Sequence, residues 1–181
     1  DWESIGYSLP LMTKNDFNVI KSGNMDNSQT CLAIGPGTGL GFSVLRYVGN
    51  VPYVYPTELG NARSYNDHLS NLFEISNSKN FIVLEDYLSG TGIKKIYAEK
   101  SGKNLTTEEI VSLYLEDDLA TFVLNNFVVA LNNILQDLAL TFNARGGIFF
   151  AGSLMRTISE MNSINYIKEE FNKHSSEAHS N

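Results

Sequence analysis

The chain has 181 residues, a formal charge of −7, 43% hydrophobic residues and 18% charged residues. These values fit one globular domain, and the acidic balance excludes nucleic acid as the main partner, because nucleic-acid-binding proteins carry a basic surface. The single cysteine, Cys31, excludes an internal disulfide and a multi-cysteine zinc site, and its apolar neighbours indicate a core residue rather than a nucleophile. No uninterrupted apolar run is long enough to span a membrane and no secretory signal is visible, so we expect a cytoplasmic protein without a membrane partner.

The first third of the chain is expected to form a helix, a connector and a set of strands. Apolar residues predict a short helix that ends near Pro10, followed by a polar, turn-rich connector. Gly49-Asn50 is typical of a two-residue hairpin turn between the second and third strands. The expected ranges are 2–9 for the helix, 14–29 for the connector, 30–34, 41–47 and 51–55 for the strands, and 56–64 for a loop.

The rest of the chain is predicted to be mostly helical, with one strand that returns late. The longest helix has nine apolar residues on one face and is expected to stop at Gly146-Gly147. A capping box, Thr106 to Glu109, begins a shorter helix. The order of elements predicts an α/β domain with a mixed sheet and flanking helices. The expected helices are 66–75, 81–98 as two helices around a glycine turn at 89–92, 106–114 and 117–144, then a strand at 148–151 and a helix after residue 153.

A glycine-rich turn between two apolar runs is the most informative local feature. Glycines alternate at positions 35, 37, 39 and 41, with one hydroxyl, on Thr38, among them. Repeated glycine indicates a backbone that takes unusual dihedral angles or lies against something. Exposed N–H groups beside a threonine hydroxyl suit phosphate oxygens, but a plain glycine hairpin explains the pattern equally well.

Four other polar positions could carry chemistry. Asp1 precedes a helix, Glu58 lies in a loop after a strand, Glu85 precedes Ser89-Gly90-Thr91-Gly92, and Gly152 follows the late strand. Taken singly, each has a structural explanation as a helix cap, a solvated charge or a turn residue. Their order along the chain carries more information than any one of them.

That order resembles the bacterial-type glucokinases of the sugar-kinase and actin-like ATPase superfamily. In that family a G-x-G-T-G-L-G turn binds ATP phosphates, and residues 35–41 match it throughout. The family's E-G-G-H loop is similar to residues 58–61, its E-x-x-L-S-G-x-G segment to residues 85–92, and its late G-G-x-x-x-A-G-G turn to residues 146–153. The opening stretch 1–10 is similar to the segment that carries the family's catalytic aspartate.

The resemblance implies an α/β domain of the actin-like ATPase (ribonuclease H-like) fold and a homodimeric kinase that phosphorylates glucose, or a similar hexose, with ATP. It implies that Asp1 is the general base that accepts the proton of the sugar's primary hydroxyl. Mg²⁺ would bridge the phosphates, with no metal-ligating residue of the protein assigned. The implied sugar-binding residues are Glu58, Asn61 and Glu85, and the implied nucleotide-binding residues are Gly35, Gly37, Thr38, Gly39, Gly41 and Gly152.

The sequence departs from the family pattern in three places. Asn61 stands where the family usually has His, Ser153 replaces a glycine, and the N-terminal D-x-G-G-T-N phosphate loop is absent. We therefore expect residues 1–12 to be a remnant of the hinge and small lobe, and residues 13–181 to be the large domain, incomplete at its C-terminus and inactive alone.

Two alternatives to a glucokinase stay open. The first is a non-catalytic sugar-binding or regulatory module of the same fold, and the second is a kinase for another hexose, such as fructose, mannose or an amino sugar. The related branch that carries a cysteine-rich zinc motif is disfavoured, because the chain has one cysteine.

Overall fold

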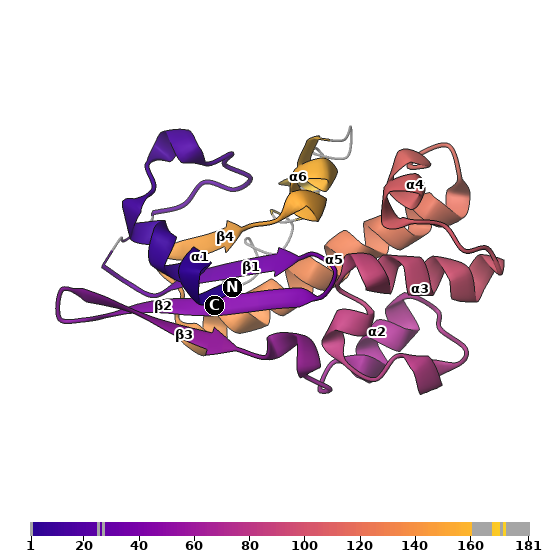
Figure 1. The fold of residues 1–181 in the computed structure, drawn as a ribbon, viewed down its shortest axis with the longest axis horizontal. Helices are drawn as coiled ribbons and strands as arrows, with labels where there is room; N and C mark the ends of the chain where they lie inside the picture. The colour runs from indigo at the N-terminus through magenta and orange to yellow at the C-terminus, as the bar shows by residue number, and fades with distance from the viewer. Residues whose placement is uncertain (1, 25, 27, 161–167, 171, 173–181) are drawn as a thin grey trace.

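The computed structural model describes residues 2–24, 26, 28–160, 168–170 and 172. Within these residues, four strands form one mixed sheet in the order β3-β2-β1-β4 (Figure 1). β1 pairs antiparallel with β2 and parallel with β4, and β2 pairs antiparallel with β3, so the expected mixed sheet is confirmed. The strands are β1 (Cys31–Pro36), β2 (Leu40–Val48), β3 (Val51–Thr57) and β4 (Gly147–Phe150).

Helices cover both faces of this sheet and extend beyond one end of it (Figure 1). α1 lies against β2 and β3 on one face, and α5 packs on the other face and against α3. The α-helices are α1 (Trp2–Ser8), α2 (Asn66–Leu72), α3 (Gly90–Ser101), α4 (Thr107–Ser112), α5 (Asp118–Phe142) and α6 (Ser153–Glu160). Short 3₁₀ turns are η1 (Leu9–Leu11), η2 (Lys14–Asp16), η3 (Leu59–Asn61), η4 (Ser78–Asn80) and η5 (Leu84–Asp86).

The strand pattern divides the core into two clusters, because successive side chains of a strand point to opposite faces. On β1, Leu32 and Ile34 join the large cluster under α5, whereas Cys31 and Ala33 join a smaller cluster under α1. Cys31 is 6% exposed, which confirms it as a core residue, and burial raises the pKa of its thiol to about 11.

The long helix α5 is the main covering element of the larger cluster. Asp117 caps it by accepting a hydrogen bond from the Ala120 N–H at 2.7 Å. It ends at Phe142, where Asn143 takes the left-handed conformation with φ of 48°, and not at the expected Gly146-Gly147. Asn tolerates that conformation, so the helix stops before the glycines.

The same helix is long and apolar enough to cross a membrane by length and composition alone, although no such run was expected from the sequence. Its most apolar window has a mean hydropathy of 1.3, and 56% of that window is buried inside the protein. Burial against the sheet and α3 accounts for the apolar side chains as those of a core helix.

The segment 81–98 differs from the two helices expected from its pattern. Its first part is only the 3₁₀ turn η5, and Gly90 and Gly92 belong to the first turn of α3 rather than to a connecting turn. Ser89 begins α3, because its hydroxyl accepts a hydrogen bond from the Gly92 N–H at 2.9 Å. The expected loop at 56–64 also differs, since β3 continues to Thr57 and η3 follows it.

Candidate active site

The glycine turn joins β1 to β2, and two of its four glycines make room for Trp2. Gly35 and Gly41 face each other across the hairpin. A Cβ atom on either residue would overlap the Trp2 indole, and one on Gly35 would also lie 2.5 Å from the Ala151 carbonyl oxygen. The absence of side chains at these two positions is therefore explained by packing of α1 on the sheet.

The third glycine, Gly39, makes room for Glu85. A Cβ atom on Gly39 would lie 2.7 Å from Glu85 Oε2, and the same oxygen accepts a hydrogen bond from the Leu40 N–H at 3.4 Å. Gly60 is equally close, because its Cβ would lie 3.0 Å from Glu85 Oε2 and 2.9 Å from the Leu40 carbonyl oxygen. The half-buried Glu85 carboxylate is thus held between the glycine turn and η3.

Glu58 and Asn61 lie on the same short segment as Gly60. Asn61 Nδ2 donates to Glu58 Oε2 at 3.1 Å, and both side chains are exposed. The Leu84 N–H donates to the Ala62 carbonyl at 2.8 Å, which ties η3 to η5. The structure therefore brings Glu85 next to the segment that carries Glu58 and Asn61, although more than twenty residues separate them in the sequence.

The apex of the glycine turn touches the beginning of α3. The Gly37 and Thr38 carbonyls accept hydrogen bonds from the Gly90 N–H and from Thr91 Oγ1, each at 2.7 Å. The Thr38 side chain is exposed, and a Cβ atom on Gly37 would meet open space. Sequence reasoning did not assign Thr91, and its only signal was its place between two glycines.

One further predicted site residue, Gly152, lies beside this turn. Gly152 follows β4 with φ of +104°, and a Cβ atom on it would be 3.7 Å from the Pro36 carbonyl oxygen, so it lies beside the end of β1. Asp1 lies outside the described residues, but its neighbour Trp2 packs on Gly35 and Gly41.

An ion pair that sequence reasoning missed holds η5 in place. Asp86 pairs with Lys95 on α3, and its other carboxylate oxygen accepts the Ile82 and Val83 N–H groups at 2.8 and 3.0 Å. Burial alone would raise the pKa of Asp86, but the hydrogen bonds from Lys95, Val83 and Ile82 outweigh it, so that the pKa lies below its usual value. The pair fixes the turn that presents Glu85.

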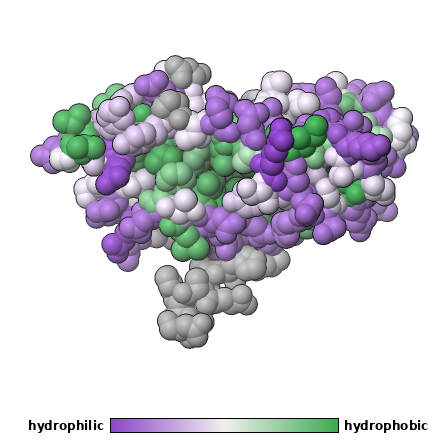
Figure 2. Space-filling model, turned by 90° about the horizontal axis from the view of Figure 1, so that it is seen from below, coloured by the Kyte–Doolittle hydropathy of each residue, from purple (hydrophilic) through white to green (hydrophobic). Residues whose placement is uncertain are grey.

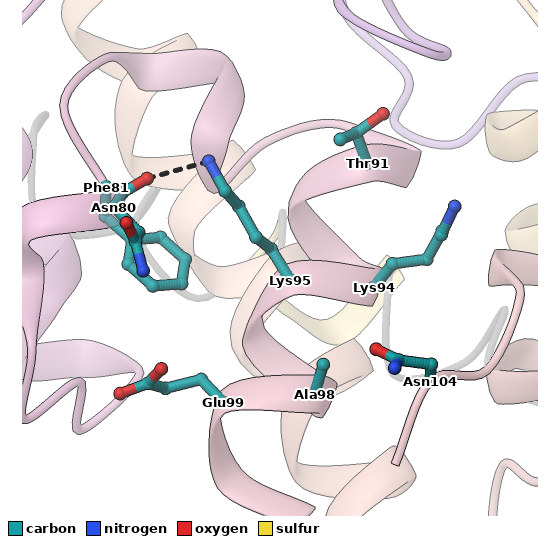
Figure 3. Close-up of a pocket in the computed structure, with 8 residues that line it drawn as sticks. All are labelled: Asn80, Phe81, Thr91, Lys94, Lys95, Ala98, Glu99 and Asn104. Carbon is teal, nitrogen blue, oxygen red and sulfur yellow. Dashed lines mark hydrogen bonds between the residues drawn. The ribbon is translucent and has the colours of Figure 1, made fainter. Parts of the chain in front are cut away.

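Lys95 also borders an open pocket of about 410 Å³ along α3 (Figure 3). Lys95 Nζ donates to the Asn80 carbonyl at 2.7 Å and lies 5.5 Å from the centre of the Phe81 ring. Neither Glu58 nor Glu85 lines this pocket, and it meets the glycine turn only through Thr91. It is lined by Asn80, Phe81, Thr91, Lys94, Lys95, Ala98, Glu99 and Asn104.

The turn and the carboxylates suit a phosphorylated ligand and a polyol better than a protein-held metal. In the part of the chain that the structure describes, no group of three or more His, Cys, Asp or Glu side chains could hold a metal ion. Mg²⁺ is commonly held through substrate phosphates with few protein ligands, so this donor set is compatible with Mg²⁺ bound by way of a nucleotide. Carboxylates, in turn, accept several hydroxyl hydrogen bonds each.

The fold is the actin-like ATPase fold, and solved sugar kinases share it. A glucokinase from an Antarctic psychrotroph superposes with a TM-score of 0.77 at 25% identity, over 93% of this chain and 60% of that one. A Balamuthia mandrillaris glucokinase in complex with glucose gives a TM-score of 0.63 at 20% identity, over 83% and 47%. A ROK family glucokinase from Streptomyces griseus, in complex with glucose and AMPPNP, gives 0.54 at 15% identity, over 81% and 52%.

Sequence comparison narrows this class to one family. The glucokinase family model matches residues 1–178, so the chain belongs to the glucokinase family. A Saccharophagus degradans glucokinase is 26% identical over 93% of this chain and 56% of its own length. A Helicobacter pylori glucokinase is 29% identical over 86% of this chain and 52% of its own length. The chain spans about half the length of the curated relatives it matches.

Proposed function

We propose that the whole protein transfers the γ-phosphoryl group of ATP to glucose, which yields glucose 6-phosphate and ADP, and that it does so in the cytoplasm. The observation that carries the proposal is the position of Glu85. Its carboxylate is hydrogen-bonded to the end of the glycine turn at Leu40 N and lies against the segment that carries Glu58 and Asn61. A residue so placed borders a sugar site and a nucleotide site at once.

The roles follow from the chemistry of the side chains. Glu58, Asn61 and Glu85 hydrogen-bond the sugar hydroxyls, and the pairs to carboxylates are charge-assisted. The turn 35–41, with Thr38 at its apex and Gly152 nearby, receives the phosphates. Asp1 accepts the proton of the primary hydroxyl as that oxygen bonds to the γ-phosphorus and ADP leaves. Mg²⁺, bound through the nucleotide, would supply charge neutralisation on the phosphates, and the protein contributes mainly by positioning the reactants.

One experiment tests the reaction and its main alternative. In the whole protein, glucose-dependent ADP release is measured for the wild type, Asp1→Asn and Glu85→Gln. We expect Asp1→Asn to reduce kcat strongly with little change in KM for glucose, and Glu85→Gln to raise KM for glucose. A protein that binds glucose in calorimetry and releases no ADP would instead be the non-catalytic sugar-binding module, which the replacement of His by Asn61 favours.

The acceptor is tested in the same assay. Asn61 both donates and accepts hydrogen bonds, so it can serve a sugar hydroxyl as a histidine would. We expect glucose to give the highest kcat/KM among glucose, fructose, mannose and glucosamine. A tenfold preference for another hexose would make the protein a kinase for that sugar.

The nucleotide site is tested by Thr38→Val. The Thr38 side chain is exposed, and its hydroxyl has no hydrogen-bond partner among the described residues, so its loss should not unfold the turn. We expect weaker ATP binding and nearly unchanged glucose binding by calorimetry. Equal ATP affinity in the two proteins would remove the phosphate role from this turn.

We propose that the whole protein is a homodimer.

We also propose that the 181-residue chain alone does not catalyse transfer. The chain spans about half of its curated relatives, and transfer requires the acceptor, the base and the γ-phosphate to be held in line. We expect weak sugar or nucleotide binding by the chain without glucose-dependent ADP release. Robust glucose-dependent ADP release by the chain would show that phosphoryl transfer needs no residues beyond these.

A further inference from the structure

The glycine turn has two backbone donors that face away from α3. The Gly37 and Thr38 carbonyls point at the Gly90 N–H and the Thr91 hydroxyl. In a trans peptide the N–H points opposite to the carbonyl oxygen of the same peptide unit, so the Thr38 and Gly39 N–H groups point away from α3. Neither N–H has a hydrogen-bond partner among the described residues.

The direction of these donors depends on contacts made from α3 and α4. Thr107 Oγ1, at the start of α4, donates to the Gly90 carbonyl at 2.9 Å, which anchors the backbone that holds Gly37. Gly90 has little space, because a Cβ atom there would lie 3.1 Å from the Gly37 carbonyl oxygen and 3.2 Å from Thr107 Oγ1. The first turn of α3 therefore serves as a fixed support under the glycine turn.

Thr91 supplies the only side-chain hydrogen bond to the glycine turn's apex, residues 37–39, among the described residues. Figure 3 shows its hydroxyl directed away from Lys94 and Lys95, toward the ribbon of the turn. The Thr91 hydroxyl has one proton, which it donates to the Thr38 carbonyl. It therefore has no proton left to donate to a phosphate oxygen. Thr91 can therefore act on a bound phosphate only by way of the turn.

We infer that Thr91 is a positioning residue for nucleotide binding, which aims the Gly39 N–H group at the phosphates by holding the Thr38 carbonyl, while the Gly90 N–H holds the Gly37 carbonyl and with it the Thr38 N–H. The inference rests on the proposed function, since it assigns the turn to ATP. Without the hydroxyl, the peptide between Thr38 and Gly39 can rotate, and ATP binding must then order it. Among the described residues, Thr91 makes no hydrogen bond with the side chains of Glu58, Asn61 or Glu85, so we expect glucose binding to be unaffected.

The test compares Thr91→Val with Thr91→Ser in the whole protein. Valine keeps the shape of threonine and lacks the donor, whereas serine keeps the donor. Losing one such hydrogen bond should raise KM for ATP and the calorimetric Kd for ATP by roughly threefold to tenfold, with KM for glucose unchanged. Thr91→Ser should restore ATP binding to within about twofold of the wild type.

A matched control is Thr141→Val on α5, which removes a hydroxyl bonded to the Asp137 carbonyl at 2.7 Å, far along the chain from the turn. It should leave both KM values unchanged. Unchanged ATP binding in Thr91→Val, equal rises in both KM values, or failure of serine to rescue would each overturn the positioning role. A wild-type protein that binds no ATP would overturn the proposed function itself, and this inference with it.

Discussion

The close approach of Glu85 to Gly39 is the main constraint at the scale of single residues. A Cβ atom on Gly39 would lie 2.7 Å from Glu85 Oε2, too close for both to keep their places. Gly35 and Gly41 instead leave room for the Trp2 indole, which covers both. One alternating glycine pattern therefore serves two unrelated contacts.

The substitution Gly39→Ala tests the contact with Glu85. The new methyl group would lie 2.7 Å from Glu85 Oε2, the mobile end of a side chain, so the carboxylate should move while the fold persists. We expect the calorimetric Kd for glucose to rise by roughly tenfold, as for a lost hydrogen bond to a charged group.

The control for this substitution is Gly23→Ala, because nothing lies within 4 Å of a Cβ atom there. It should leave the Kd for glucose and the melting temperature unchanged. Wild-type glucose affinity in Gly39→Ala would separate Glu85 from the sugar.

At the scale of elements, the connection between η5 and α3 determines where Glu85 is presented. Asp86 joins the two through Lys95 and through the Ile82 and Val83 N–H groups. α3 in turn supports the glycine turn through Gly90 and Thr91. A single helix therefore positions both the predicted sugar side and the predicted nucleotide side of the site.

The substitution Asp86→Asn should weaken this connection. We expect a loss of about 1–2 kcal/mol in the free energy of unfolding at pH 7, measured by urea denaturation. The folded-state pKa of Asp86 is depressed, so its stabilising effect is present above the unfolded-state pKa and is lost as the pH falls through the folded-state pKa. The difference between variant and wild type should therefore shrink below about pH 4.

The pair of Lys100 and Glu74, in which the carboxylate is exposed, offers a control. Its atoms are 3.3 Å apart, and the Glu74 side chain is 70% exposed. Glu74→Gln should cost less than about 0.5 kcal/mol, because solvent screens exposed pairs. A pH-independent effect of Asp86→Asn would mean that the carboxylate charge has no part in holding η5.

The edge strand β3 shows how this element avoids unwanted pairing. The Gly49-Asn50 turn sets its register with β2. In that register the backbone hydrogen-bonding positions of residues 52, 54 and 56 face the open edge of the sheet. Two of these three are prolines, which have no N–H to offer an incoming strand.

At the scale of the whole molecule, apolar surface remains exposed after the core has formed. Seen from the side of β3, a band of apolar surface lies in the middle of the molecule and another patch lies at the end reached by the β2–β3 hairpin (Figure 2). The hairpin end carries Val48 and Val51, which are 62% and 65% exposed, and Leu140 on α5 is 81% exposed. Exposed apolar patches commonly mark interaction sites.

The proposed homodimer is tested by sedimentation of the whole protein at micromolar concentration. If α5 contributes to the interface, Leu140→Lys should shift the dimer toward monomer by introducing a charge into apolar surroundings. Leu11→Lys, at a site that is 83% exposed on η1, should leave the equilibrium unchanged. A wild-type protein that sediments only as monomer would contradict the dimer.

Much of the fold could be predicted from local pattern. The apolar face of α5, the capping box at Thr106 and the Gly49-Asn50 hairpin were all expected, because helical periodicity, caps and two-residue turns depend on neighbouring residues. The predictions were wrong where another nearby residue could also begin or end a helix. Asn143 ended α5 before the glycines did, and Ser89 capped α3 at a place where glycines suggested a break.

The sequence by itself determined the family, the mixed α/β domain, and the candidate residues Glu58, Asn61, Glu85 and Thr38, because these follow from motif order and periodicity along the chain. Only the tertiary structure decided which contacts each residue makes. Trp2 covers Gly35 and Gly41, and Thr91 holds Thr38 across 53 positions of the chain. Such contacts depend on how β1, η5 and α3 pack together in space, and packing of distant segments leaves no periodic trace in the sequence.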